Sequence, residues 1–161
     1  MKICERGLNW IQVCDENGLV NVCSWRRKAE IGNLLQDSFY DIYHGKTAEK
    51  IRDELIQGDY SDCWVENCPF LSNKSIDKHC VNIQQIPEYP DTISLSYEGK
   101  CNYRCTCCSS HDHMEMGKQC DWSENYRKIE TELRKVLPYI KCISAHGRGE
   151  LFVSPSIMKM L

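Results

Sequence analysis

Twelve cysteines in a chain of 161 residues are the feature that most restricts how this protein can fold. Residues 1–10 lack the apolar core of a signal peptide, so we expect the chain to stay in the cytoplasm. Cytosolic thiols remain reduced, and closely spaced cysteines there are more often metal ligands than disulfides. We therefore expect most of them to hold metal or iron–sulfur centres, with disulfides and inert thiols as the alternatives.

Charge is nearly balanced, with 20 Lys and Arg residues against 23 Asp and Glu residues. A protein that binds nucleic acid or anionic lipid through surface charge carries a basic excess, so we expect neither partner here. The sequence also contains no apolar run near the roughly 20 residues that a membrane-spanning helix needs. These features predict a cytoplasmic protein with no nucleic-acid or membrane partner.

The cysteines fall into two segments that a proline-containing stretch separates. Pro87 and Pro90 disfavour helix and sheet, so residues 84–91 are predicted to be a linker. Residues 1–83 are predicted to form an α+β module, and residues 92–161 the start of a larger α/β domain. The predicted fold class is therefore α/β.

The first segment predicts a hairpin followed by two short helices. Apolar residues of 10–13 and 19–22 flank the turn Asp15–Gly18, whose Asn-Gly pair tolerates positive φ. Asp37 or Ser38 can cap a helix that runs through Tyr43, and Gly45 ends it. A second helix is predicted from after Thr47 to Gly58. Cys63 and Cys68 then follow in a loop.

The second segment predicts a strand, a cysteine-rich loop, a helix and a second strand. Apolar residues alternate with serines over residues 92–97, which is strand periodicity. Apolar side chains recur at helical spacing over residues 123–137 and share one face. Residues 142–146 form the second predicted strand and lead into the sequence Gly-Arg-Gly-Glu at 147–150. Strand, helix and strand make a βαβ unit, which favours a parallel sheet.

The loop of the second segment contains Cys101, Cys105 and Cys108 at the spacing C-x3-C-x2-C. An iron–sulfur cluster that only carries electrons normally takes four cysteine ligands. Three close ligands leave one iron open, which can chelate a small molecule and pass it an electron. The position also fits, because α/β sheets bind ligands beyond the carboxyl ends of their strands.

This loop, after a strand of the type I-S-L-S-Y, resembles the radical S-adenosylmethionine superfamily. The resemblance implies that Cys101, Cys105 and Cys108 hold a [4Fe–4S] cluster and that the open iron binds S-adenosylmethionine. A second landmark is a Gly-Gly-Glu-Pro-like stretch that contacts the amino group of the cofactor, and it corresponds here to Gly147, Gly149 and Glu150. Glycines let a backbone approach a ligand closely, and a carboxylate accepts hydrogen bonds from an ammonium group.

Two positions depart from the pattern of that superfamily. The residue before the third cysteine is usually aromatic, but here it is Cys107, which could compete with Cys108 as a ligand. Leu151 stands where the second landmark normally has proline. A structural zinc site that uses these cysteines with His111 or His113 is the alternative, although zinc sites usually show two separated cysteine pairs.

The cysteines of the first segment resemble the SPASM or twitch module, which binds an auxiliary [4Fe–4S] cluster in many radical S-adenosylmethionine enzymes. The turn Asp15–Gly18, the Ile-Gly-Asn segment at 31–33 and the helix after it carry the resemblance. It implies one auxiliary cluster, with Cys14 or Cys80 as possible substitutes for a ligand and a zinc ribbon as the alternative centre. The implied ligands are Cys4, Cys23, Cys63 and Cys68.

The resemblance as a whole implies that residues 92–161 are the first βαβ unit of a truncated (β/α)6 barrel, the N-terminal part of the core domain of an enzyme of the oxidoreductase or maturase type. Such an enzyme cleaves S-adenosylmethionine reductively to a 5′-deoxyadenosyl radical, which abstracts hydrogen from a peptide or protein substrate. A reductase or flavodoxin-type protein would supply the electron. Because the chain ends just after the second strand, we expect this piece alone to be catalytically incomplete, either as a fragment or as a reduced form that needs a partner. The alternative function is a non-catalytic iron–sulfur electron carrier or a zinc-binding interaction module.

One further expectation concerns the basic run Arg26-Arg27-Lys28, which follows the second cysteine of the auxiliary set. A short run of charges is usually solvated. We therefore expect these three side chains to lie on an exposed turn.

Overall fold

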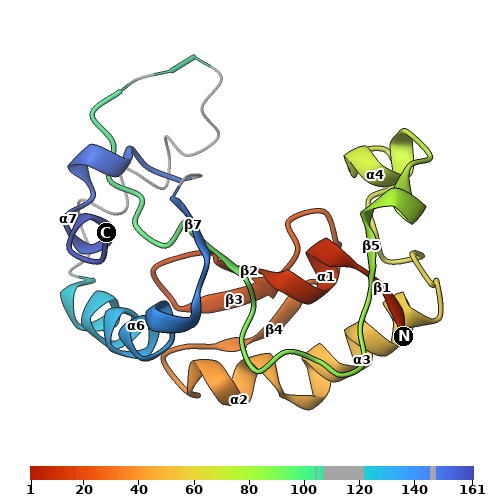
Figure 1. Ribbon diagram of the computed structural model, residues 1–161. Helices are drawn as coiled ribbons and strands as arrows, with labels where there is room; N and C mark the ends of the chain where they lie inside the picture. The colour runs from red at the N-terminus through yellow and green to blue at the C-terminus, as the bar shows by residue number, and fades with distance from the viewer. Residues whose placement is uncertain (104, 107–121, 146–147) are drawn as a thin grey trace.

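A five-stranded mixed sheet with the strand order β4-β3-β2-β6-β7 forms the centre of the structure (Figure 1). The computed structural model describes residues 1–103, 105–106, 122–145 and 148–161. The strands of this sheet are β2 (Trp10–Val13), β3 (Leu19–Val22), β4 (Glu30–Asn33), β6 (Thr92–Leu95) and β7 (Cys142–Ala145). A second, two-stranded sheet pairs β1 (Lys2–Cys4) with β5 (Cys80–Asn82).

The predicted hairpin is confirmed. Strands β2 and β3 pair antiparallel, with Ile11 opposite Val22. The turn between them is held by the Asp15 carboxylate, whose Oδ1 accepts hydrogen bonds from the amides of Asn17 at 3.0 Å and Leu19 at 3.2 Å. Gly18 follows with φ +79°, a conformation that glycine adopts without steric cost.

Strand β4 was not predicted from the Ile-Gly-Asn segment. It extends the hairpin by pairing antiparallel with β3, with Gly32 opposite Val20. Gly32 packs against Ile42 of the following helix so tightly that a Cβ atom would lie 2.8 Å from an Ile42 side-chain carbon. The glycine therefore lets a helix lie directly against the strand.

The two cysteine segments share one sheet. Strand β6 of the second segment pairs parallel with β2 of the first, from Trp10 opposite Thr92 to Val13 opposite Leu95. On its other side β6 pairs parallel with β7, as the βαβ pattern predicts. Residues 84–91 contain no helix or strand and connect β5 to β6. The chain is thus of mixed α/β class, with the predicted linker running between two strands of different sheets.

Strand β6 is central and buried on both faces. Ile93 and Leu95 are fully buried, as their alternation predicts, but Ser94 between them and Ser96 after the strand are buried as well, at 0% and 2% exposure. Strand β6 has a paired strand on each side, so it lies inside the sheet and not at its edge. Small side chains suit such a position, since they leave room for neighbouring elements to approach.

The helices largely follow their sequence signals. Ser38 caps α2 by accepting a hydrogen bond from the Asp41 amide at 3.1 Å, and α3 begins directly after Gly45, slightly earlier than predicted. The face of α6 that carries Ile129 and Leu133 is buried, as predicted. The helices are α1 (Glu5–Asn9), α2 (Phe39–Tyr43), α3 (Lys46–Ile56), α4 (Pro69–Ser72), α6 (Ser123–Val136) and α7 (Pro155–Met158), with short 3₁₀ turns η1 (Ile76–His79), η2 (Leu137–Tyr139) and η3 (Leu151–Val153). Within the described ranges, no helix is both long and apolar enough to cross a bilayer.

Candidate metal centre

Four cysteines from distant parts of the first segment line one cavity of about 400 Å³, a volume that includes its open mouth. They come from the end of β1, the end of β3, the loop after α3 and the start of α4. Apolar and aromatic side chains such as Val22, Leu55 and Phe70 supply much of the remaining lining. The four are the residues predicted as auxiliary-cluster ligands: Cys4, Cys23, Cys63 and Cys68.

Cys23 occupies an unusual backbone conformation at the end of β3. Its φ is +60°, which few residues other than glycine adopt and which costs on the order of 1–3 kcal/mol. The conformation is held by the Cys23 amide, which donates to the Trp10 carbonyl at 3.2 Å. The Trp25 amide in turn donates to the Cys23 sulfur at 3.5 Å. A hydrogen bond of this kind stabilises a thiolate, which is the form that binds metal.

The loop between Cys63 and Cys68 explains the four-residue spacing of the closing pair. The Cys68 amide donates to the Trp64 carbonyl at 2.7 Å, which closes one helix-like turn within the loop. That turn takes up the extra residues and leaves Cys68 buried at 6% exposure immediately before Pro69. Cys63 is half-buried, and its amide donates to the Tyr60 carbonyl at 2.9 Å.

Burial and neighbouring thiols both affect the pKa values of the cysteines that line the cavity. The pKa of Cys23 is raised to about 12. Burial is the largest cause, and the charges of Cys4, Cys63 and Cys68 contribute in the same direction. Burial likewise raises the pKa of Cys4, against the backbone amides of Gly7 and Arg6 that lower it. Four thiolates can be buried together only with positive charge between them, which the iron ions of a cluster supply.

The donor set and the cavity fit an iron–sulfur cluster. A single zinc ion gathers its sulfur ligands at about 2.3 Å, whereas a four-iron cluster spreads four thiolates over four metal ions. Cys4, Cys23, Cys63 and Cys68 all line the same cavity, so four thiolates are available to one centre.

Two other cysteines of the first segment lie outside the cavity lining. Cys80 faces Cys4 across the β1–β5 pair, and its sulfur lies 3.7 Å from the Tyr60 hydroxyl. Cys14 follows β2, and its thiol donates to the Gln12 carbonyl at 3.6 Å. Of the two, Cys80 is therefore the one next to a predicted ligand.

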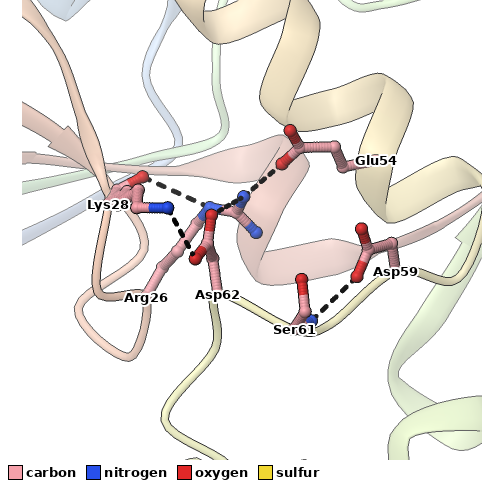
Figure 2. Close-up of polar contacts among 6 residues, drawn as sticks. All are labelled: Arg26, Lys28, Glu54, Asp59, Ser61 and Asp62. Carbon is pink, nitrogen blue, oxygen red and sulfur yellow. Dashed lines mark hydrogen bonds and ion pairs between the residues drawn. The ribbon is translucent and has the colours of Figure 1, made fainter.

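Arg26 contradicts the expectation of an exposed basic turn. It is buried at 6% exposure and pairs with Glu54 of α3 (Figure 2). Its Nε donates to the Lys28 carbonyl at 3.3 Å, and a terminal nitrogen lies 3.6 Å from Asp62. Lys28 stays exposed and reaches Asp62 at 3.2 Å. Sequence reasoning missed this residue because its acidic partners lie far along the chain.

The second cysteine loop lies only partly within the described residues. Cys101 is half-buried and Cys105 is exposed, and the Tyr103 amide donates to the Cys101 sulfur at 3.4 Å. Four other candidate ligands fall outside the described ranges: Cys107, Cys108, His111 and His113. Gly147, a predicted contact of S-adenosylmethionine, also falls outside them.

The two landmarks of the second segment come together in the structure. The Glu150 amide donates to the Lys100 carbonyl at 2.8 Å, one residue before Cys101. Gly149 packs so closely on this backbone that a Cβ atom would lie 2.7 Å from the Glu98 carbonyl oxygen, and closer still to that of Lys100. The parallel pairing of β6 with β7 brings both landmarks to the same edge of the sheet.

Glu98 is a second residue that the sequence analysis missed. Its carboxylate is 1% exposed and accepts hydrogen bonds from the amides of Ser156 at 2.9 Å and Ile157 at 3.4 Å at the start of α7. It also lies 3.6 Å from the Lys100 ammonium. Glu98 therefore fixes the C-terminal helix against the backbone that leads into the Cys101 loop.

Comparison with known families identifies the first segment. Residues 4–69 match the family model of SPASM, described as an iron-sulfur cluster-binding domain. The matched range begins at Cys4 and ends one residue after Cys68, so it contains all four cysteines that line the cavity. No match was found among the curated proteins or the solved structures. Residues 4–69 are therefore similar to the SPASM iron–sulfur cluster-binding domain, a domain typical of radical S-adenosylmethionine enzymes.

Proposed function

We propose that the chain is the cluster-bearing part of a radical S-adenosylmethionine enzyme. Cys4, Cys23, Cys63 and Cys68 would hold an auxiliary [4Fe–4S] cluster in the shared cavity. A second [4Fe–4S] cluster would take its ligands from Cys101, Cys105 and Cys108 and would bind S-adenosylmethionine. The observation that carries the second assignment is the packing of Gly149 and Glu150 against the base of the Cys101 loop.

The residues near the second loop suit an amino-acid ligand. Glu150 is half-buried, and its carboxylate can accept hydrogen bonds from the ammonium group of S-adenosylmethionine. Gly149 has no side chain, which lets this backbone lie directly against that of Glu98 and Lys100 at the base of the Cys101 loop. A cluster held by Cys101, Cys105 and Cys108 would supply one-electron reduction of S-adenosylmethionine, which is the chemistry proposed for this site.

Cys23 and the Cys101 loop lie at opposite ends of the paired strands of the sheet. Cys23 follows β3 and bonds to Trp10 at the start of β2, whereas the Cys101 loop follows the end of β6. Because β2 and β6 run parallel, the length of a four-residue strand, about 13 Å, lies between these ends. The auxiliary cluster would therefore exchange electrons across the sheet, and S-adenosylmethionine would bind at the other end.

The substrate proposed is a peptide or protein, and the electron donor a reductase or flavodoxin-type protein in the cytoplasm. The substrate class is proposed from the resemblance to SPASM-containing enzymes, which commonly modify peptides or protein side chains.

Anaerobic reconstitution with iron and sulfide tests the proposal. The wild-type chain should bind about eight irons, the double variant Cys101→Ala/Cys105→Ala about four, and Cys23→Ala should lose the auxiliary cluster. Adding S-adenosylmethionine should change the visible spectrum of the wild type and of Cys23→Ala, and leave that of the double variant unchanged. Zinc with no visible absorption, or a spectrum that ignores S-adenosylmethionine, would contradict the proposal.

A further inference from the structure

We propose that Arg26 is a positioning residue of the auxiliary cluster, which fixes the Cys63 loop against α3 and whose positive charge makes the cluster easier to reduce. This inference rests on the proposed auxiliary cluster and adds a determinant of its reduction potential. It concerns a side chain that lies in the cavity wall and is not itself a ligand.

Backbone pairing places Arg26 beside a ligand. Residues on either side of it bond to the Cys63 loop: the Arg27 amide donates to the Asp62 carbonyl at 2.8 Å, and the Trp64 amide donates to the Trp25 carbonyl at 2.9 Å. Arg26 and Cys63 are therefore directly opposite each other in a short antiparallel bridge. This pairing fixes where the guanidinium can lie relative to the Cys63 thiol.

Polar contacts with three other residues also hold the Arg26 guanidinium in place. Glu54 of α3 and Asp62 of the loop contact it, and the Lys28 carbonyl accepts from its Nε at 3.3 Å (Figure 2). Five donors in a planar fork allow one arginine to make these contacts together, which a lysine cannot do. The network therefore connects α3, the 26–28 turn and the Cys63 loop.

The charge of Arg26 acts on the cavity more strongly than the charges of its partners. The Arg26 side chain is 3% exposed, whereas those of Glu54 and Asp62 are 27% and 28% exposed and therefore more screened by water. Both charged residues in the described cavity wall are cationic, because the other is Arg6, which lies over the rings of Trp10 at 3.8 Å and Trp25 at 4.7 Å. The wall thus presents positive charge to the space between the thiols.

That sign matters for reduction. A [4Fe–4S] core of charge 2+ with four thiolates carries a net charge of 2−, and adding one electron makes it 3−. A nearby cation stabilises the more negative state, so it raises the reduction potential, and charge near a cluster is one of the factors that set that potential. Removing the cation should lower the potential, and removing the carboxylate that partly neutralises it should raise it.

A redox titration of variants tests the inference. The full chain is reconstituted anaerobically in a Cys101→Ala/Cys105→Ala background, so that only the auxiliary cluster is followed by electron paramagnetic resonance. Arg26→Gln should reduce the equilibrium constant for one-electron reduction about tenfold, which is about 59 mV. Glu54→Gln should shift the potential the opposite way, and Arg26→Lys, which keeps the charge but not the planar fork, should give a value between those of Arg26→Gln and the wild type.

Arg52 provides the matched control. It is also a buried arginine, at 3% exposure, but it stacks on the Tyr43 ring at 4.1 Å and does not line the cavity. Arg52→Gln should cost stability and leave the potential unchanged. A structural role alone for Arg26 would give the same pattern.

Each outcome decides a different claim. If the background protein binds no iron–sulfur cluster, the proposed auxiliary site is itself wrong. If the cluster forms and neither Arg26→Gln nor Glu54→Gln moves the potential relative to Arg52→Gln, the inference about Arg26 is overturned. If Arg26→Gln loses its cluster, Glu54→Gln decides: a raised potential supports the inference, and an unchanged one refutes it.

Discussion

Replacing Gly149 by alanine tests whether the two landmarks of the second segment must lie in contact. The new Cβ would lie 2.7 Å from the Glu98 carbonyl oxygen and even nearer to that of Lys100, and both are backbone atoms that cannot rotate away. The chain must then separate here, which also weakens the 2.8 Å hydrogen bond from the Glu150 amide to the Lys100 carbonyl.

The magnitude follows from these two costs. Overpacking costs about 1–3 kcal/mol and the loss of a hydrogen bond about 0.5–1.5 kcal/mol, which together give a loss of about 1.5–4.5 kcal/mol. With a urea slope of about 2 kcal/mol per molar, the middle of the range for small proteins, the unfolding midpoint should fall by about 1–2 M. The S-adenosylmethionine-induced spectral change should weaken at the same time, because Glu150 moves with Gly149.

Gly99 offers a control within the same stretch of backbone. A Cβ at Gly99 would meet no atom within 4 Å, so Gly99→Ala should leave both readouts near those of the wild type. Urea unfolding of the anaerobically reconstituted proteins and titration with S-adenosylmethionine measure the two effects. The reasoning fails if Gly149→Ala and Gly99→Ala behave alike in both.

Three further predictions follow from single residues. Burial, followed by the charge of Asp15, raises the pKa of Cys14 to about 12. Its neutral thiol should therefore resist alkylation at pH 8 and react as the pH approaches 12 or after unfolding. Mass spectrometry that compares the alkylation rates of Cys14 and the exposed Cys105 measures this, and equal rates at pH 8 would contradict the prediction. Glu98→Ala should lower the free energy of unfolding by about 1–3 kcal/mol, because buried amides of α7 lose their acceptor; urea unfolding checks it, and an unchanged midpoint would refute the capping role. Ser38→Ala should cost about 1 kcal/mol by removing the cap of α2, whereas Ser38→Asp should retain most of the stability.

Local signals in the sequence were sufficient for several elements. The Asp15–Gly18 turn, the cap at Ser38 and the apolar face of α6 are each confirmed, because turn chemistry, capping and helical spacing act between residues close along the chain. Strand β4 escaped prediction because its glycine weakens the strand pattern and serves a contact with Ile42 of α2. Strands β1 and β5 escaped because each has three residues, too few to show a period.

The spacing of the cysteines and the family resemblance likewise predict four ligands of an auxiliary cluster: Cys4, Cys23, Cys63 and Cys68. In the structure all four line one cavity. Spacing could not say what surrounds them. Arg26 appeared as part of a solvated basic run, because nothing near it in the sequence reveals that Glu54 will approach from α3. Glu98 went unnoticed for the same reason, since its amide donors belong to α7.

The sequence by itself therefore determined which short segments form the hairpin and the helices, and it predicts which cysteines would hold clusters. Only the tertiary structure decided that β2 pairs with β6, so that both cysteine segments share one sheet with their sites at opposite ends of its strands. The physical reason is that a strand pairs with whichever strand still has unpaired backbone groups once the rest of the chain has folded. The periodicity of a sequence indicates only which face of a strand is buried, and it carries no information on which strand will lie beside it.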